Sequence, residues 1–341
     1  MRIRVLGAVA TAAALLSTVP TAFGPAANAA GNAKARYVVL SGDSKYLVYA
    51  EAVQRSALDP ISLPAHANLY ALGRTGKPMS LGKAGAGGGL QLVSLSQSMV
   101  VVVNTFKTGH RVRWWNLDSG KSGDLSSNEH LLGATPDGWI TRDGGYPDGK
   151  HVVARSVDGD IVDYGNPLQK GVDFGIAVGP NGFVAYADNF LNDNGEITYT
   201  PWAHPTVHRV LAAPGGKNVR CDSVSPSYAA CLLGGGSRRA VALFALRGNH
   251  RTTGGGRCVN EATVWGTRVA WDIALSNHGC RAGHLGQMTQ LGTTRLSKLR
   301  FNPAAITTAW RRLVTSRQGQ GALVTLGAIR GTPKPLKRAN I

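Results

Sequence analysis

A strand-turn-strand unit recurs about every 44 residues along this 341-residue chain and constrains the fold more than any other feature. Residues 37–49 show the unit: an apolar strand, a tight turn and a second apolar strand. Strands bounded by Gly, Asn, Asp or Pro are typical of β-hairpins. Comparable turns are expected near Asp43, Ser96, Asp137, Asn181, Pro226, Gly266 and Trp310. Seven such units predict an all-β protein, a seven-bladed β-propeller with four-stranded antiparallel blades.

Each blade is expected to contain an inner hairpin followed by an outer one. Residues 68–77 form the outer hairpin of the first unit, and residues 112–121 form that of the second. The blades are predicted at residues 36–84, 89–126, 130–166, 172–213, 218–254, 257–296 and 303–337. Because no Pro-, Ser- or Thr-rich linker divides residues 30–341, we expect one propeller domain, and a monomer.

The first 29 residues have the pattern of a secretory signal peptide. Arg2 and Arg4 precede an apolar run over residues 5–16, and Ala27-Asn28-Ala29 provides a small-residue cleavage site. The apolar run is shorter than the roughly 20 residues of a membrane-spanning helix, and no later segment approaches that length. The sequence therefore predicts a secreted protein without a transmembrane segment, extracellular or retained at the cell wall by its charge.

All four cysteines lie between positions 221 and 280, and an exported chain is expected to oxidise them. Cys221 and Cys231 are equidistant from the turn at Pro226, so they face each other across one hairpin. Cys258 and Cys280 are placed at the same end of the next blade. We predict the disulfides Cys221–Cys231 and Cys258–Cys280; a zinc site is the alternative, but no Cys-x-x-Cys spacing is present.

Short motifs resemble two families of propeller repeats. Residues 113–121 (RWWNLDSGK) resemble the end of a WD40 repeat, and residues 134–141 (ATPDGWIT) and 178–186 (VGPNGFVAY) resemble the first hairpin of TolB-type repeats. The resemblance extends over the mature chain as a period and implies a propeller fold rather than a particular activity. The use of Gly, Ala and Arg with few Lys resembles proteins of high-GC actinobacteria.

Motifs that could indicate catalysis are better explained as turns. Gly42-Asp43-Ser44 resembles the nucleophile block of SGNH-type esterases, but no acidic residue follows Asp272 to complete a late Asp-x-x-His motif. Residues 120–122 (GKS) lack the upstream glycine of a P-loop. The glycine-rich run 84–89 is expected to connect two blades, and no catalytic residue is assigned.

Metal sites are not strongly indicated. The nine histidines include the close pairs His204/His208 and His278/His284, but none has the His-Glu-x-x-His spacing. Residues 188–196 collect oxygen donors in the manner of a calcium loop, although their spacing is not that of an EF-hand. The candidate calcium ligands are Asp188, Asp193, Asn194 and Glu196. No cofactor other than this calcium ion is expected.

Charge is distributed unevenly along the chain. Residues 31–206 contain 15 Lys or Arg and 16 Asp or Glu, whereas residues 207–341 contain 20 and 3, so the net charges are −1 and +17. A uniform drift in composition would spread the positive charge over the whole chain. Charge confined to blades five to seven instead favours a polyanionic partner, attracted by the summed potential and by counterion release.

Arginine outnumbers lysine 16 to 4 in residues 207–341, and its planar guanidinium suits phosphate, sulfate or carboxylate. The candidate contacts are Arg238, Arg239, Arg247, Arg251, Arg257, Arg281 and Arg317; loop positions place Arg238, Arg257, Arg281 and Arg317 near one mouth of the ring. We expect a non-catalytic binding protein for teichoic acid, acidic polysaccharide or DNA. The alternatives are a propeller lyase or hydrolase with its site at the channel mouth, and a scaffold that binds proteins.

Overall fold

The protein is an all-β propeller with four-stranded antiparallel blades. Its structure is a computed structural model that describes residues 35–53, 67–74, 76–84, 90–106, 109–125, 130–143, 151–168, 174–187, 196–212, 218–235, 238–254, 258–273, 284–289, 294–298, 303–309, 312–317, 323–326 and 334–335. The predicted signal peptide lies outside these ranges. Within them, there is no helix with the length and hydropathy needed to cross a membrane.

The first four sheets come from the neutral part of the chain. The first contains β1 (Ala35–Gly42), β2 (Tyr46–Val53), β3 (Asn68–Gly73) and β4 (Met79–Lys83). The second contains β5 (Leu90–Ser96), β6 (Met99–Phe106), β7 (Gly109–Asn116) and β8 (Ser122–Leu125). The third contains β9 (His130–Ala134), β10 (Gly138–Asp143), β11 (His151–Ser156) and β12 (Ile161–Asp163). The fourth contains β13 (Phe174–Gly179), β14 (Gly182–Ala187), β15 (Ile197–Pro201) and β16 (Arg209–Ala212).

Three further sheets come from the basic part of the chain. The fifth contains β17 (Val219–Val224), β18 (Tyr228–Leu233), β19 (Ala240–Ala245) and β20 (Arg251–Gly254). The sixth contains β21 (Val259–Trp265), β22 (Arg268–Ile273), β23 (His284–Thr289) and β24 (Thr294–Lys298). The seventh contains β25 (Pro303–Ala309), β26 (Arg312–Arg317), β27 (Leu323–Leu326) and β28 (Lys334–Pro335).

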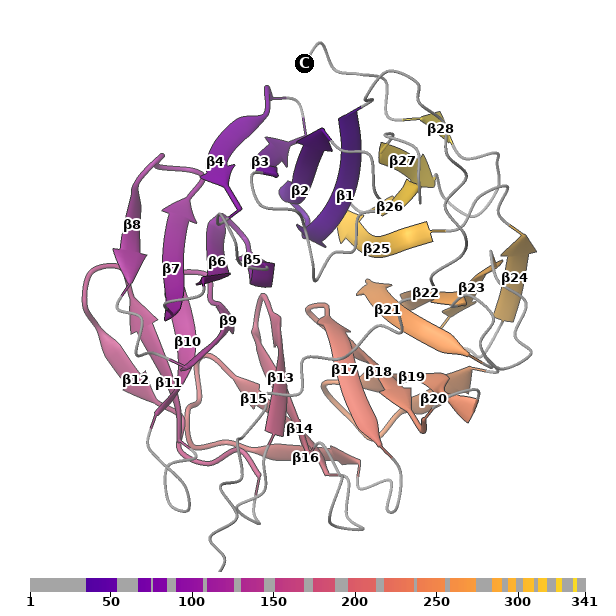
Figure 1. The fold of residues 1–341 in the computed structure, drawn as a ribbon. Coiled ribbons are helices and arrows are strands. Elements are labelled where there is room, and N and C mark those ends of the chain that lie inside the picture. Colours follow the sequence, from indigo (N-terminus) through magenta and orange to yellow (C-terminus); the bar gives the residue numbers. More distant parts are fainter. Residues whose placement is uncertain are drawn as a thin grey trace, which may run out of the picture.

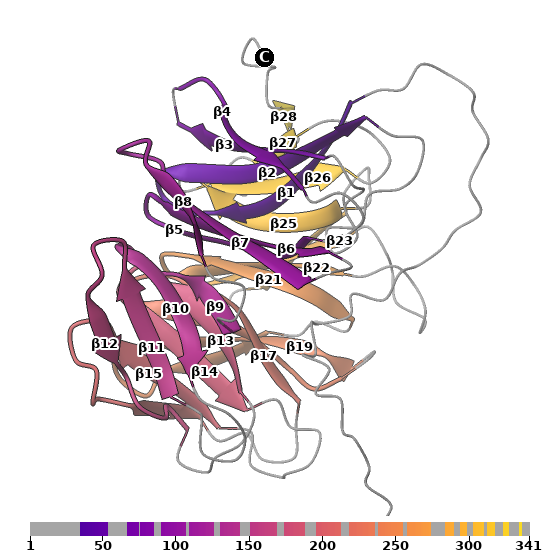
Figure 2. The ribbon, with the colours of Figure 1, turned by 60° about the vertical axis from the view of Figure 1, so that its left-hand side comes forward.

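The sheets follow one another around a centre, and the first strand of each is innermost (Figures 1 and 2). Each sheet pairs its strands in chain order, so none of the described strands is exchanged between the first and last sheets. They meet through packing instead, because β1 contacts β25 and Tyr37 and Tyr49 share an apolar cluster with Ala309 and Val314.

The hydrophobic core lies mainly between neighbouring sheets. The second strands are apolar on both faces, as in the run Met99–Val103, because each is covered by a sheet on either side. Separate buried clusters join the first sheet to the second, the second to the third, and so on to the sixth. Each sheet therefore depends on its neighbours to bury its faces.

The short turns that join the first and second strands follow the residues predicted for them. In the first sheet, the Asp43 Oδ1 atom accepts hydrogen bonds from the backbone N–H groups of Lys45, at 2.7 Å, and Tyr46, at 2.8 Å. In the fifth sheet, Pro226 lies between β17 and β18, with the Ser225 hydroxyl bonded across the turn. Asp43 and Ser44 thus belong to a β-turn, which agrees with the structural interpretation of Gly42-Asp43-Ser44.

Gly138 occupies a position with no room for a side chain. A Cβ atom there would lie 1.9 Å from the backbone oxygen of Arg155 on β11, which pairs with β10. We expect Gly138→Ala to lower the free energy of unfolding by about 2 kcal/mol or more, since two paired backbones would have to separate. Gly76→Ala is the matched control, because a Cβ atom at Gly76 has no neighbour within 4 Å. Equal urea midpoints for the two variants would contradict this prediction.

Candidate functional site

Blade five carries its predicted arginines at two opposite ends. We call the end where β17 begins and β18 finishes the entry face, and the end where β17 turns into β18 the turn face. Arg238 and Arg239 lie between β18 and β19, on the entry face. Arg247 and Arg251 lie at the connection from β19 to β20, on the turn face. The candidate residues of this blade are therefore divided between the two faces of the ring.

The described arginines differ in accessibility. Arg238, Arg247 and Arg251 are exposed, whereas Arg239 is half-buried. The Arg251 guanidinium lies 5.4 Å from the ring centre of Phe244, a cation-π arrangement. Burial and the nearby positive charge of Arg220 lower the pKa of Arg239. Two guanidinium groups therefore lie close together at the entry face.

The connection that carries Arg247 is held by the preceding blade. Arg209, on β16, donates hydrogen bonds to the backbone oxygens of Leu246, at 3.1 Å, and Gly248, at 2.9 Å. Arg268, the first residue of β22, is also exposed on the turn face of blade six. Nothing in the sequence marks this strand-initial arginine as exposed. The exposed Arg268 continues the basic surface from blade five onto blade six.

The other predicted arginines are described in part or not at all. Arg317 ends β26 and pairs with Pro303 at the start of β25, so its backbone lies on the entry face. Arg257 and Arg281 lie outside the described residues. The shared mouth predicted for Arg238, Arg257, Arg281 and Arg317 therefore stays a prediction.

The acidic residues of blades five to seven lie between the blades. Asp222, Glu261 and Asp272 are the only acidic residues after position 206, and they meet between blades five and six. Asp272 is 3% exposed and the Asp222 side chain is 11% exposed. Glu261 is half-buried as a whole residue, and protein surrounds its carboxyl group. No acidic side chain therefore remains to neutralise the outer surface of blades five to seven.

In blades one to four, by contrast, exposed acidic and basic groups pair with each other. Lys45 lies 3.0 Å from Asp118, and Arg111 and Arg113 both contact Asp124, at 3.0 and 3.1 Å. On the third blade, the described pairs are Arg155 with Asp143 and His151 with Asp163. Surface ion pairs of this kind add little stability, but they neutralise the surface locally. The described arginines of blade five have no such partners on the surface.

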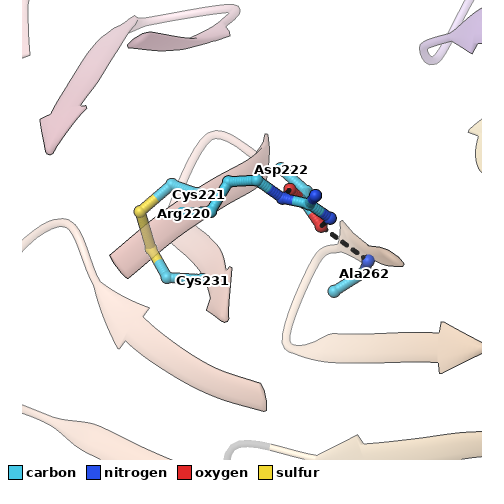
Figure 3. The surroundings of a disulfide bond; sticks show 5 residues. All are labelled: Arg220, Cys221, Asp222, Cys231 and Ala262. Atoms are coloured by element: carbon cyan, nitrogen blue, oxygen red, sulfur yellow. Dashed lines mark hydrogen bonds and ion pairs between the residues drawn. A yellow bond between two sulfur atoms is a disulfide. The ribbon is translucent and has the colours of Figure 1, made fainter. Parts of the chain in front are cut away.

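The polar cluster between blades five and six contains one cation. Arg220 pairs with Asp222 through its Nε and Nη2 atoms, at 2.6 and 3.1 Å, and also donates to the backbone oxygen of Asn260. Burial disfavours the charged guanidinium, but Asp222 outweighs this effect and raises the pKa of Arg220. Figure 3 shows Arg220 and Asp222 projecting together from β17 toward Ala262 on β21.

The carboxylates of the cluster accept hydrogen bonds from backbone groups. The Asp222 Oδ2 atom accepts from the Ala262 N–H at 2.9 Å, and the Asp272 Oδ1 atom accepts from the Glu261 N–H at 2.7 Å. The Glu261 Oε2 atom accepts from the N–H of Ile306, on β25, at 3.0 Å. These bonds connect blade five to blade six and blade six to blade seven.

Burial makes ionisation of two carboxyl groups in this cluster, Glu261 and Asp272, unfavourable. Burial and the charges of Asp272 and Asp222 raise the pKa of Glu261 to about 8. Burial also raises the pKa of Asp272, to about 6, although hydrogen bonds from Glu261 and Asn260 favour its charged form. A hydrolase or lyase could use such carboxyl groups as an acid or a base. Here the carboxyl groups accept hydrogen bonds from backbone N–H groups of neighbouring strands. We therefore assign the cluster a structural role.

The predicted Cys221–Cys231 disulfide is confirmed. The two cysteines face each other in the β17–β18 pair, with Cα atoms 3.9 Å apart (Figure 3). Cys258 is also disulfide-bonded. Its predicted partner, Cys280, lies outside the described residues, so that pairing stays a prediction.

The other predicted sites give no metal centre among the described residues, where no group of three or more His, Cys, Asp or Glu side chains has an arrangement that could hold a metal ion. Asp188, Asp193 and Asn194 lie outside these residues, so the calcium loop stays a prediction, and Glu196 directly precedes β15. His208 contacts the Thr200 hydroxyl at 2.9 Å, and burial lowers its pKa.

Gly120 ends a turn by donating to the Asn116 backbone oxygen, which agrees with the hairpin interpretation of residues 120–122.

Comparison with known proteins supports the propeller fold alone. No family model and no curated protein matches this sequence. Among solved structures, a prolyl endopeptidase matches with a TM-score of 0.61 and 10% identity over 89% of this chain and 50% of its own. The propeller domain of the Trilobed protease from Pyrococcus furiosus matches with a TM-score of 0.58 and 9% identity over 90% and 99% of the two chains.

TolB from Acinetobacter baumannii matches with a TM-score of 0.49 and 13% identity, over 86% of this chain and 66% of its own. This chain spans half the length of the matched prolyl endopeptidase. The matches to the prolyl endopeptidase and to the propeller domain of the Trilobed protease show that this protein has a β-propeller fold, and identities this low carry no activity over to it.

Proposed function

We propose that this protein is a secreted, non-catalytic binding protein whose last three blades engage an anionic polymer of the cell envelope or its surroundings. The observation that carries the proposal is the location of the acidic residues. Asp222, Glu261 and Asp272 are enclosed between blades, so the positive charge on the outside of this sector is not offset. Binding of a polyanion to these positive groups would release its condensed counterions, which favours association.

The proposal treats the seven sheets as one closed seven-bladed ring. The contact between β1 and β25 and the apolar cluster of Tyr37, Tyr49, Ala309 and Val314 support it. In such a ring blades five to seven are contiguous, and their basic residues form one sector. Export is supported by the signal-like N-terminus and by two disulfide-bonded cysteine sites, since disulfides persist in oxidising compartments.

Retention of the purified protein on immobilised heparin and on double-stranded DNA tests the proposal. We expect retention on both matrices to fall steeply between about 0.1 and 0.5 M salt. The triple variant Arg238→Glu, Arg247→Glu, Arg268→Glu is expected to reduce the apparent affinity by roughly tenfold or more, because it removes three cations and adds three anions.

The matched control is Arg74→Glu, Lys77→Glu, Lys121→Glu, which changes the net charge equally but on exposed residues of blades one and two. We expect the control to retain most of the affinity. Equal losses in the two variants would show that net charge, and not the basic sector, governs binding. Retention independent of salt would overturn the polyanion proposal. A preference for heparin over DNA, or the reverse, would identify sulfate or phosphate as the favoured group.

A further inference from the structure

Three inner strands use a side chain to hold the inner strand of the next sheet. On β5, the Ser94 Oγ atom accepts a hydrogen bond from the Ala134 N–H on β9, at 2.9 Å. The Asp222 carboxylate on β17 accepts a hydrogen bond from the Ala262 N–H on β21. The Glu261 carboxylate on β21 accepts one from the Ile306 N–H on β25. The first of these bonds uses a neutral hydroxyl, whereas the other two use groups that can ionise.

The surroundings of Glu261 decide what its ionisation would do. On β17 it faces Arg220 and Asp222, and on β22 it faces Asp272. On β25 it meets the Ile306 backbone, and that strand, residues 303–309, contains no charged residue. Arg239 is farther away, near Arg220. Three carboxyl groups thus share one close guanidinium, so their ionisation together would leave uncompensated negative charge in the interior.

We infer that Asp222, Glu261 and Asp272 form a pH-sensitive clasp that joins blades five, six and seven and loosens as the solution becomes alkaline. Arg220 and the Ile306 N–H favour the Glu261 carboxylate, but burial and the two neighbouring carboxylates outweigh them. A proton on the cluster is therefore bound more tightly when the blades are closed than when they separate. Linkage then requires that loss of the proton favours separation.

The Cys221–Cys231 disulfide fixes the part of β17 that presents the clasp. The strand register shifts between Cys221 and Ser223, so Asp222 is the extra residue of a β-bulge. The disulfide directly precedes this residue and ties the bulge to β18 (Figure 3). Asp222 and Arg220 are thus held toward blade six by a covalent constraint within blade five.

Hydrogen exchange at single amides tests the clasp on the intact protein. Protection factors, corrected for the intrinsic dependence of exchange on pH, would be measured at Ala262 and Ile306 between pH 5.5 and 9. We expect both to fall by roughly tenfold or more as the pH rises through the region where Glu261 ionises, since one pKa unit corresponds to a tenfold change. The amide of Ala134, bonded to neutral Ser94, is the internal control and should show no such fall.

Glu261→Gln is expected to abolish most of the dependence on pH at Ile306, because its side-chain oxygen can still accept the hydrogen bond but cannot ionise. Asp272→Asn is a second variant and should shift the fall in protection to lower pH, because it removes a negative charge that raises the pKa of Glu261. Constant protection at Ala262 and Ile306 in the unmodified protein would overturn the inference without any variant. An equal fall at Ala134 would also overturn it, because the whole ring would then be loosening.

Discussion

Replacing Trp271 by alanine is expected to lower the free energy of unfolding by about 3 to 5 kcal/mol, the usual cost of removing a buried aromatic side chain. Trp271 is fully buried on β22. It packs in a cluster that includes Leu232 and Leu243 from blade five and Val264 and Val269 from blade six. The substitution would therefore open a cavity at a junction between blades and weaken both of them.

Urea unfolding followed by tryptophan fluorescence and circular dichroism would measure this loss. Val207→Ala is the control, because Val207 is 48% exposed, and we expect its effect to stay within about 0.5 kcal/mol. A loss below about 1 kcal/mol for Trp271→Ala would mean that the junction of blades five and six contributes little to global stability. Such a result would contradict the division of the core into layers between the sheets.

The second large effect concerns the charge of Glu261. Its pKa is raised from the ordinary value of 4.5 to about 8 in the folded protein, so the folded state binds the proton more tightly than the unfolded state does. Stability is therefore greatest below pH 4.5 as far as this group is concerned, and it falls as the pH rises from 4.5 to 8. Glu261→Gln removes this loss.

We expect Glu261→Gln to match the unmodified protein near pH 4 and to exceed its stability at pH 9 by an amount on the order of 3 kcal/mol. The measurement is the difference in unfolding free energy between the two proteins at each pH, which cancels the titration of distant groups. Ser94→Ala should instead lower the free energy of unfolding by an amount that does not change with pH, since it removes a neutral hydrogen bond. A variant less stable than the unmodified protein at pH 9 would mean that the carboxylate stabilises the ring.

Much of the fold follows from local sequence patterns. The turn residues Asp43 and Pro226 and the apolar strands beside them predicted β-hairpins, and the period of the hairpins predicted a propeller of four-stranded antiparallel blades. The pairing of Cys221 with Cys231 followed from their equal distance from one turn. These features depend on residues close together in the chain, so their geometry can be derived without the rest of the molecule.

The clasp could not be predicted in this way. In the sequence, Asp222, Glu261 and Asp272 are three acidic residues in a basic segment, and no motif beside them indicates that they meet. Each bonds a backbone group about 40 residues away or on the adjacent strand, at bulges whose position depends on strand register. The burial of these residues, and the raised pKa values of Glu261 and Asp272, arise from the packing of one sheet against the next.

Three features can be derived from the residues alone: the repeating unit, the pairing of one disulfide, and the confinement of net positive charge to residues 207–341. Each is a property of composition or of residues close together in the chain. Which of these charges face solvent depends on the tertiary structure. It enclosed the three acidic residues between blades and divided Arg238 and Arg239 from Arg247 and Arg251 onto opposite faces. The physical reason is that burial and charge compensation depend on the contacts between sheets, which no single repeat contains.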